Sequence, residues 1–448
     1  MALEEILIIG GVAAGLSAAS RARRLSPSAH ITVLEKGPVA GYGACGLPYF
    51  LSGRIASLDR LLAHPPEFFR KQRNIDLRVN HEALAIEPGR RRVAVRAEGK
   101  AEQWFGYDRL VIATGARSHW TPPGLRNVFA ANTWAQVEAL DRALTGENLR
   151  RVTVVGGGYI GLEVAEALRL RGLEVTLIDR RGTLLHGLEE GLAAALPGLV
   201  RAAGITLHQG VNAEGLEGAA GGRVLGVRTA KGVIEADAVI NCAGLRPEVA
   251  LAQAAGVTLG RFGGIEVDDR QQTNLAGIFA AGDCAETRDR VTGRAIWVPL
   301  GAAANKQGRV AGQNAAGGAA ARFAGVLGTL AVPLFGEEWG RTGLSLEQAR
   351  AAGYDAATET VAGESQAGYL APRPITVTLV YQPSTARLLG CHLRGAPGTV
   401  AGRLGVAAVA LAAGMKLEEL EQQDLPYAPG LAPLYDPLLI AAHNARSH

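Results

Sequence analysis

Residues 6–15 read Ile-Leu-Ile-Ile-Gly-Gly-Val-Ala-Ala-Gly, and residues 152–161 read Val-Thr-Val-Val-Gly-Gly-Gly-Tyr-Ile-Gly. Each stretch is an apolar strand with a glycine-rich turn. An alanine-rich helix, a second apolar strand and an acidic residue follow, Glu35 in the first copy and Asp179 in the second. Such a turn lets the backbone approach a pyrophosphate at a helix N-terminus, and the acidic residue accepts hydrogen bonds from ribose hydroxyls. The repeat therefore predicts two dinucleotide-binding units.

Two further segments, 110–116 and 273–283, indicate which nucleotides the two units bind. Both resemble segments of flavoproteins with two dinucleotide-binding domains. The resemblance implies that the first segment returns the chain to the FAD domain and that Asp283 contacts the ribityl-phosphate region of the flavin; the alternative for Asp283 is a helix N-cap. The candidate cofactor-binding residues are Gly10, Gly11, Gly15, Glu35, Lys36, Thr114, Gly115 and Asp283 for FAD, and Gly156, Gly158, Gly161 and Asp179 for NAD(P)H.

The order of these segments predicts an α/β protein with two Rossmann-like domains, one for FAD and one for NAD(P), the second inserted into the first. Strand-like alternation in 375–381 and 387–392, followed by an Ala/Leu-rich helical stretch over 400–413, predicts a third, α+β dimerisation domain. The expected boundaries are 1–117 (FAD, first part), 118–245 (NAD(P)), 246–325 (FAD, second part) and 326–448 (dimerisation).

Length and charge exclude several other classes. At about 150 residues per domain, 448 residues suggest about three domains. The net charge of +4, from 46 Lys plus Arg and 42 Asp plus Glu, argues against a dedicated binder of nucleic acid or anionic membranes. There is no apolar run of about 18 residues and no secretory signal pattern, and the four scattered cysteines lack the spacing of a disulfide or metal site. A cytoplasmic protein without a bound metal is expected.

Cys45 is the candidate redox centre. Pro48 is tolerated only in the first turn of a helix, which places Cys45 at or just ahead of a helix N-terminus, where the dipole favours a thiolate. Cys242, Cys284 and Cys391 lie in apolar strand or strand-end contexts and are expected to be buried structural cysteines.

The segment around Cys45 resembles that of pyridine-nucleotide disulfide oxidoreductases. Members with a redox-active dithiol have CxxxxC, but Phe50 stands five residues after Cys45. The chain is therefore similar to the single-cysteine group, which comprises coenzyme A disulfide reductases, NADH oxidases and NADH peroxidases. In this group the peroxidases and water-forming oxidases have a histidine in the first glycine turn, where this chain has Ala13. The resemblance therefore favours a coenzyme A disulfide reductase.

Helical spacing gives a second argument for such a substrate. One face of the first helix carries Ala13, Ser17, Arg21 and Arg24. The side chains are small near the expected position of the reactive sulfur and basic farther along the helix. A long anionic substrate with a terminal thiol requires this order of groups. The alternative is a solvated basic face. Known members have an asparagine at the position of Ala44. The candidate substrate-binding residues are Ser17, Arg21, Arg24, Ala44, Asn305 and Tyr435.

The C-terminal segment 424–437 resembles a family segment whose tyrosine reaches the active site of the other subunit. The resemblance implies a homodimer and makes Tyr427 a catalytic candidate, with Tyr369 as a second active-site tyrosine; taken alone, each is consistent with interface packing.

The sequence thus predicts an FAD enzyme that uses NAD(P)H to reduce coenzyme A disulfide, or a coenzyme A persulfide or polysulfide, through a mixed disulfide with Cys45. Coenzyme A is expected as a substrate, and no nucleic-acid or membrane partner is expected. The alternatives are an NADH oxidase and a redox-sensing flavoprotein that acts through a partner.

Overall fold

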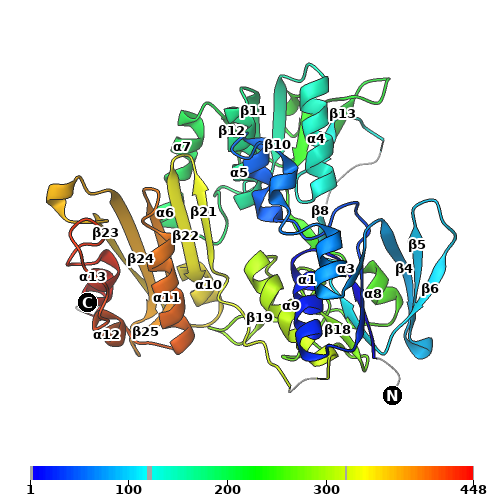
Figure 1. Ribbon diagram of the computed structural model, residues 1–448. Helices are drawn as coiled ribbons and strands as arrows, with labels where there is room; N and C mark the ends of the chain where they lie inside the picture. Colours follow the sequence, from blue (N-terminus) through cyan, green and yellow to red (C-terminus); the bar gives the residue numbers. More distant parts are fainter. Residues whose placement is uncertain (1–3, 119–123, 318–319, 447–448) are drawn as a thin grey trace.

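The computed structural model describes residues 4–118, 124–317 and 320–446 and shows three units (Figure 1). The first is built on a parallel sheet in the order β18-β7-β1-β2-β3. Its strands are β1 (Glu5–Ile9), β2 (His30–Leu34), β3 (Asp76–Arg78), β7 (Arg109–Ile112) and β18 (Ile278–Ala280).

Both faces of this sheet are covered. Ile6 and Ile8 pack with helices α1 (Ala13–Leu25) and α9 (Gly301–Ala315). Leu7 and Ile9 pack on the other face, against helix α8 and an antiparallel sheet. Burial on both faces explains why β1 is an uninterrupted apolar run rather than an alternating one. The covering elements are α8 (Ala250–Ala254), β4 (His81–Glu87), β5 (Arg92–Ala97) and β6 (Gln103–Gly106).

The inserted unit repeats this plan with a parallel sheet in the order β12-β11-β10-β16-β9. Val152 and Val154 of its central strand share a core with helices α4, α5 and α7, and Val155 packs with a three-stranded antiparallel sheet. The elements are β9 (Val128–Ala130), α4 (Trp134–Gly146), β10 (Arg151–Val155), α5 (Tyr159–Leu170), β11 (Glu174–Asp179), α7 (Leu196–Ala202), β12 (Thr206–Gln209), β13 (Gly215–Gly218), β14 (Val224–Thr229), β15 (Gly232–Glu235) and β16 (Ala238–Asn241).

The two chain segments that connect the first unit to the inserted unit lie side by side. β8 (Ala116–Ser118) pairs antiparallel with β17 (Leu245–Pro247), and the predicted boundaries after residues 117 and 245 fall within this pair. The boundaries themselves stay a prediction.

The C-terminal unit is a five-stranded antiparallel sheet in the order β21-β22-β25-β24-β23. Helix α11 packs on β22 and β25, and α13 packs on β23 and β24. The predicted α+β class is confirmed. Its elements are β21 (Leu330–Leu334), β22 (Glu337–Gly343), α10 (Leu346–Ala351), β23 (Ala357–Glu364), η4 (Gly368–Leu370), β24 (Pro374–Gln382), β25 (Arg387–Gly395), α11 (Ala401–Ala413), α12 (Leu417–Glu421) and α13 (Pro437–Asn444).

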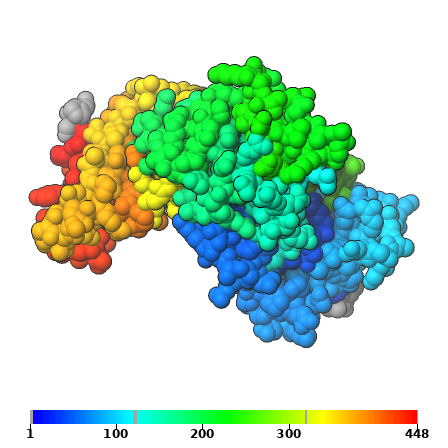
Figure 2. Space-filling view, turned by 90° about the horizontal axis from the view of Figure 1, so that it is seen from above, coloured from blue at the N-terminus to red at the C-terminus, as the bar shows by residue number. Residues whose placement is uncertain are grey.

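One core joins the three units. Leu47 and Leu51 of α2 (Leu47–Leu51), Leu162 of α5 and the fully buried Trp339 of β22 belong to the same hydrophobic cluster. Helix α2, which directly follows Cys45, therefore contributes to the core that the three units share. Much of the C-terminal unit extends to one side of the molecule (Figure 2). The remaining short elements are η1 (Ala44–Gly46), η2 (Leu58–Leu61), α3 (Pro66–Arg73), η3 (Pro88–Arg90), α6 (Glu190–Ala193), β19 (Thr287–Arg288) and β20 (Ala295–Ile296).

No helix in the described ranges combines the length and the apolar character needed to cross a membrane.

Candidate active site

The first glycine turn joins β1 to α1, and Gly10 and Gly15 in it leave no room for a Cβ atom. Gly10 has a φ of +107°, and a Cβ there would lie 2.0 Å from the carbonyl oxygen of Ala113. A Cβ on Gly15 would lie 1.8 Å from the carbonyl oxygen of Gly10. The N–H of Gly11 donates a 2.7 Å hydrogen bond to Glu35 Oε2. The turn and the acidic residue predicted for the FAD site therefore form one preorganised unit.

The second turn has the same geometry. Gly156 has a φ of +113°, and a Cβ on Gly161 would lie 1.8 Å from the carbonyl oxygen of Gly156. The N–H of Gly157 donates a 2.6 Å hydrogen bond to Asp179 Oδ2. A Cβ on Gly158, at the N-cap of α5, would meet no described atom within 4 Å. The open side of this turn suits the close approach of a ligand.

Asp283 carries the strongest sign of a missing polar partner. It follows β18 at the sheet edge next to the first turn, and it is half-buried. Its carboxylate makes no hydrogen bond or ion pair with any described residue, and burial raises its pKa to about 6. No helix begins after Asp283, so the N-cap alternative is wrong. A desolvated carboxylate without a partner fits a hydroxyl-rich ligand such as the ribityl chain of FAD.

The other candidates for the FAD site lie around the same sheet edge. The hydroxyl of Thr114 donates a 2.6 Å hydrogen bond to the carbonyl of Glu248, which ties the end of β7 to the returning chain. Gly115 has a φ of +75°. Lys36 is exposed and has no hydrogen-bond or ion-pair partner among the described residues.

Cys45 lies in η1, directly before α2, as the position of Pro48 predicts. A Cβ on Gly301, the first residue of α9, would lie 3.9 Å from the Cys45 sulfur. The sulfur therefore sits where α9 begins, four residues before Asn305 in the same helix.

The pKa of the Cys45 thiol is raised, which corrects the expectation that the helix favours its thiolate. Desolvation is the largest cause, followed by the negative charges of Glu163 and Asp283. Helix α2 has only five residues, so its dipole is too short to outweigh these effects. Cys284 and Cys391 are buried as predicted, whereas Cys242 is half-buried, and desolvation raises the pKa of all three thiols.

Four of the six predicted substrate residues, Ser17, Arg21, Arg24 and Asn305, lie on the adjacent helices α1 and α9. Asn305 Nδ2 donates a 2.8 Å hydrogen bond to Ser17 Oγ, and Arg21 Nε donates a 3.0 Å hydrogen bond to Gln313 Oε1. Arg24 is exposed and makes no ion pair with any described residue. We call Ser17, Asn305, Arg21, Gln313 and Arg24 the α1–α9 stripe. It joins the predicted residues of α1 to the predicted Asn305 of α9, and it adds Gln313, which was not predicted.

Two glycines of α9 allow α1 and α9 to pack closely against each other. A Cβ on Gly308 would lie 2.1 Å from the carbonyl oxygen of Ala14, and one on Gly312 would lie 2.1 Å from that of Ala18. Figure 1 shows α1 and α9 side by side in the first unit. The stripe therefore runs along both helices, away from the sulfur.

Three predicted tyrosines lie on the surface of the C-terminal unit. Tyr427 is 51% exposed, and Tyr369 and Tyr435 are each 76% exposed. The N–H of Ala367 donates a 3.0 Å hydrogen bond to the carbonyl of Pro429, which joins the loops that carry Tyr369 and Tyr427. Ala44 stays half-buried beside the sulfur.

Residues 4–308 match the family described as pyridine nucleotide-disulphide oxidoreductase, and residues 331–435 match the dimerisation domain of that family. The chain belongs to this family.

Individual members are similar over almost the whole chain. An NAD(P)H coenzyme A polysulfide/persulfide reductase of Pyrococcus horikoshii is 37% identical, over 98% of this chain and 98% of its own. An NADH oxidase of Methanocaldococcus jannaschii is 31% identical, over 98% of each chain. The solved structure of an NAD-dependent persulfide reductase from A. fulgidus matches with a TM-score of 0.93 and 33% identity, covering 98% of this chain and 83% of that one.

This pyridine nucleotide-disulphide oxidoreductase is thus an FAD-dependent enzyme that uses NAD(P)H, which confirms the predicted class and cofactors. The FAD fit rests on the unpartnered carboxylate of Asp283 and on the glycine turn that a Cβ would block.

Sequence reasoning missed two titratable groups on α5 that are coupled electrostatically to the sulfur. Tyr159 and Glu163 are four residues apart on α5, and both interact electrostatically with Cys45. The hydroxyl of Tyr159 donates a 3.2 Å hydrogen bond to the carbonyl of Pro299, just ahead of α9. The available signal was their i, i+4 spacing after the second glycine turn, which places both on one helix face.

Proposed function

We propose that this enzyme reduces a disulfide or persulfide of coenzyme A, using Cys45 as its single redox-active thiol. The observation that carries the proposal is the sulfur at the head of the α1–α9 stripe, with Arg21 and Arg24 farther along the same helix face. A thiol-terminated arm that ends in an anionic nucleotide matches this order of groups. The printed function of the P. horikoshii relative supports the same substrate class.

We assign the FAD site to the first glycine turn, Glu35, Thr114, Gly115 and Asp283, and the NAD(P)H site to the second turn and Asp179. A bound FAD would supply two-electron transfer between NAD(P)H and sulfur. The glycine turns place backbone N–H groups near the pyrophosphates. Asp283 receives the hydrogen bonds that its buried carboxylate lacks within the described chain.

The proposed substrate step is thiol–disulfide exchange. The Cys45 thiolate attacks one sulfur of coenzyme A disulfide, the Cys45–S–S–CoA bond forms, and the other coenzyme A leaves as a thiolate. Two electrons then cleave the mixed disulfide and release the second thiol. With one proton from solvent and one hydride from NAD(P)H, the sum is one disulfide converted to two thiols. A coenzyme A persulfide would give coenzyme A and hydrogen sulfide by the same electron count.

The proposal includes a homodimer. The C-terminal unit matches a dimerisation domain, and it carries exposed apolar and aromatic side chains on its outer loops. A second copy of the chain would bury them and bring Tyr427 of the partner subunit toward Cys45. The side chains are Tyr369, Leu370, Tyr427, Leu431, Leu434 and Tyr435.

An NADH oxidase is the second candidate, because a relative of that name is 31% identical. Ala13 disfavours it, since a methyl group offers no acid–base chemistry beside the sulfur. A redox sensor that acts through a partner is a third reading, and it predicts little turnover of either substrate.

The deciding experiment measures NAD(P)H oxidation with coenzyme A disulfide, with pantethine, or with oxygen alone. Pantethine is the matched probe, because it has the same disulfide and arm but lacks the nucleotide. The proposal requires faster turnover with coenzyme A disulfide, or with coenzyme A persulfide assayed as a fourth arm, than with pantethine or oxygen. Equal rates with pantethine would remove the stripe from substrate recognition, and fastest turnover with oxygen would establish the oxidase.

A further inference from the structure

Residues 184–189 of the inserted unit, which we call the nucleotide segment, lie between the second glycine turn and the C-terminal unit. The N–H of Leu185 donates a 2.9 Å hydrogen bond to the carbonyl of Gly157 in that turn. His186 Nε2 lies 3.4 Å from Oδ2 of Asp179, the acidic residue of the proposed NAD(P)H site. The first half of the segment therefore contacts both parts of that site, the turn and the carboxylate.

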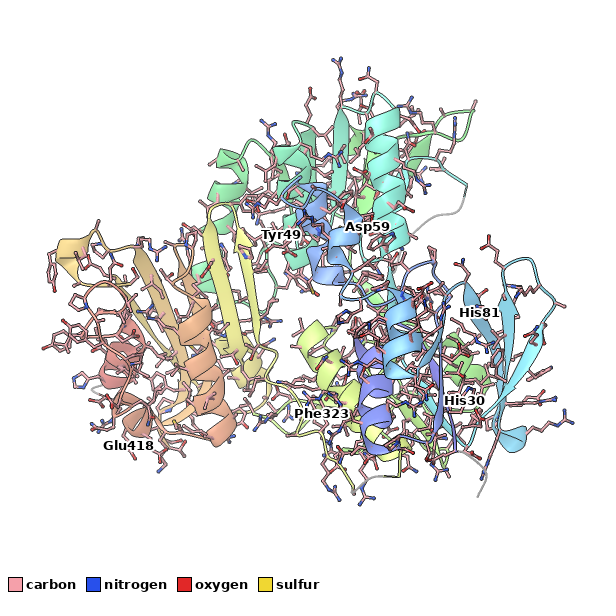
Figure 3. All side chains as sticks on the ribbon, in the orientation of Figure 1. His30, Tyr49, Asp59, His81, Phe323 and Glu418 are labelled. Carbon is pink, nitrogen blue, oxygen red and sulfur yellow. The ribbon has the colours of Figure 1, made fainter. Side chains whose placement is uncertain are left out.

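The second half of the nucleotide segment is held by the C-terminal sheet. Arg341 Nη1, on β22, donates a 3.2 Å hydrogen bond to the carbonyl of Gly187. His392 lies opposite Arg341 on β25, and its Nδ1 accepts a 3.0 Å hydrogen bond from the N–H of Glu189. Figure 3 shows the side chains of this region, where the green inserted unit reaches the yellow strand β22. Two side chains of another unit thus fix the backbone that carries His186.

The contact made by His392 and Glu189 is complete within the chain. His392 Nε2 donates a 3.0 Å hydrogen bond to the carbonyl of Leu344, which leaves Nδ1 as the acceptor. Burial lowers the pKa of His392 to about 4, so the ring is neutral near pH 7. Glu189 Oε2 accepts a 2.9 Å hydrogen bond from the N–H of Leu346. These bonds anchor the end of the segment without any charge on the histidine.

Arg341 differs from His392 because its charge is not compensated. Among the described residues no carboxylate pairs with it, and its buried Nε has no hydrogen-bond partner. Burial lowers the pKa of the guanidinium group. A desolvated cation without a counter-ion lowers stability, and an apolar side chain of the same length would avoid that cost. An arginine at this position is therefore better explained by what it holds than by packing.

The group that Arg341 holds is Gly187, and the fit is close. Gly187 has a φ of +85°, and a Cβ there would lie 2.2 Å from Arg341 Nη1. The guanidinium group thus fills the space that a side chain at position 187 would need. Since His186 directly precedes Gly187, a displacement of Arg341 would move the residue that contacts Asp179.

We propose that Arg341 is a positioning residue for NAD(P)H, which holds the nucleotide segment against the second glycine turn so that His186 stays beside Asp179. Arg341 acts through Gly187 and not on the reacting atoms. Without it, the hydrogen bond between Asp179 and the N–H of Gly157 would remain, but the wall that His186 forms would loosen. The effect should therefore fall on nucleotide affinity and not on hydride transfer. This inference rests on the proposed NAD(P)H site and is independent of the proposed disulfide substrate.

The first test measures the affinity of the FAD-loaded enzyme for NADH. Stopped-flow absorbance follows flavin reduction at several NADH concentrations, without oxygen or any disulfide. Arg341→Met keeps the length of the side chain and removes its charge and its donors. We expect the apparent Kd for NADH to rise at least about fivefold, while the limiting rate of flavin reduction stays within about twofold. Arg341→Lys keeps a cation of similar length and should restore part of the lost affinity.

The second test approaches the same contact from the other side. Gly187→Ala places a methyl group against the guanidinium group and should also weaken NADH binding. Gly172→Ala is the matched control, because Gly172 has a φ of +86° and a Cβ there would meet no described atom within 4 Å. It imposes the same backbone strain and should leave the affinity unchanged. In the double variant of Gly187→Ala and Arg341→Met, the loss should be at least about twofold smaller than the product of the two separate losses.

The outcomes separate positioning from packing. Flavin content, dimer mass and melting temperature are measured for every variant. A lower melting temperature of Arg341→Met with unchanged affinity for NADH would show a structural role alone and would overturn the inference. Equal effects of Gly187→Ala and Gly172→Ala, or a double variant whose losses simply multiply, would also overturn it. If Arg341→Met does not fold, the comparison of the two glycine variants decides.

Failure of the two earlier proposals would look different. NADH and NADPH affinities that do not respond to Asp179→Asn would defeat the proposed nucleotide site, and the Arg341 variants would still show whether that side chain sets NADH affinity. Absence of turnover with coenzyme A disulfide would defeat the proposed substrate and leave the flavin-reduction measurements unaffected.

Discussion

Asn305 of α9 donates a 2.8 Å hydrogen bond to Ser17 of α1, although 288 residues separate them in the chain. This bond joins the two sides of the α1–α9 stripe near its sulfur end. Cys45 lies where α9 begins, and Arg21 lies one helical turn beyond Ser17. The spacing places cationic groups at a distance from the reacting sulfur, which suits a substrate that carries its charge far from its thiol.

The first prediction concerns that charge. Arg21→Ala combined with Arg24→Ala should raise KM for coenzyme A disulfide by about five- to thirtyfold, because two partly exposed phosphate contacts each contribute about 0.5–1 kcal/mol. The salt dependence of KM should flatten, and KM for pantethine should not change. Arg142→Ala removes an exposed arginine on α4 and is the control for loss of positive charge away from the stripe. Equal effects on both substrates would show a change in the fold rather than in phosphate binding.

The second prediction isolates the sulfur. Cys45→Ser should abolish disulfide reduction, because a hydroxyl group does not form the mixed disulfide, while NAD(P)H should still bleach the yellow colour of the bound flavin. Stopped-flow absorbance follows the bleaching, and thiol release follows the disulfide reaction. Cys284→Ser changes a buried thiol and serves as the comparison. Thiol release at the normal rate by Cys45→Ser would remove this residue from the mechanism.

The fold could be predicted from particular patterns. The runs Ile6–Ile9 and Val152–Val155 are apolar throughout because both faces of each parallel sheet are covered, and the glycines that follow have carbonyl oxygens where a Cβ would stand. The antiparallel sheets β4-β5-β6 and β13-β14-β15 were not predicted. Each covers one face of a parallel sheet, and their short strands have weak periodicity.

Residues of the site could be predicted from the sequence only where the residue type alone determines the chemistry at that position. Cys45 and the glycine turns are such positions. The raised pKa of Glu163 depends first on its burial in the folded chain, which its local sequence does not show. The raised thiol pKa likewise follows from partial desolvation and from the charges of Glu163 and Asp283, which are distant from Cys45 in sequence.

The third prediction concerns the effect of the raised Glu163 pKa on the free energy of unfolding. Its pKa is near 4.5 in the unfolded chain and about 7 in the fold, so the folded state binds this proton more tightly. The stability contributed by the protonated group is complete below pH 4.5 and is lost as the pH rises through 7. Relative to the unaltered enzyme, Glu163→Gln should therefore gain up to about 3 kcal/mol between pH 4.5 and pH 8. Melting temperatures at both pH values measure this, and a parallel decrease for both proteins would contradict it.

The fourth prediction concerns the nicotinamide nucleotide. Asp179 accepts hydrogen bonds from Gly157 and from the N–H of Arg181, at 2.6 and 2.7 Å. Its negative charge should disfavour a 2′-phosphate, so NADH should be used at least as well as NADPH. Asp179→Asn should shift the ratio of kcat/KM toward NADPH by about tenfold, roughly 1.4 kcal/mol. An unaltered enzyme that prefers NADPH by more than about tenfold would overturn the assignment of Asp179.

The last prediction places Tyr427 in the active site of the opposite subunit. Disulfide cleavage leaves charge on the departing sulfur, and the first glycine turn offers no histidine, because position 13 is alanine. Tyr427 is 51% exposed within one chain, which leaves its hydroxyl available to a second copy. As a phenol it can stabilise the leaving thiolate and donate a proton. Tyr427→Phe keeps the ring and should lower turnover with coenzyme A disulfide while flavin content and dimer mass stay unchanged.

Mixed dimers give the decisive measurement for this arrangement. In a heterodimer of Cys45→Ser and Tyr427→Phe subunits, a shared site combines both substitutions in one site and leaves the other site intact, because each site takes its sulfur from one chain and its phenol from the other. Activity should therefore rise above that of either parent, toward half of the unaltered value on a dimer with two independent sites. Differently tagged subunits, isolated after exchange, establish that heterodimers are present. If they are present and no more active than the parents, Tyr427 does not act across the interface.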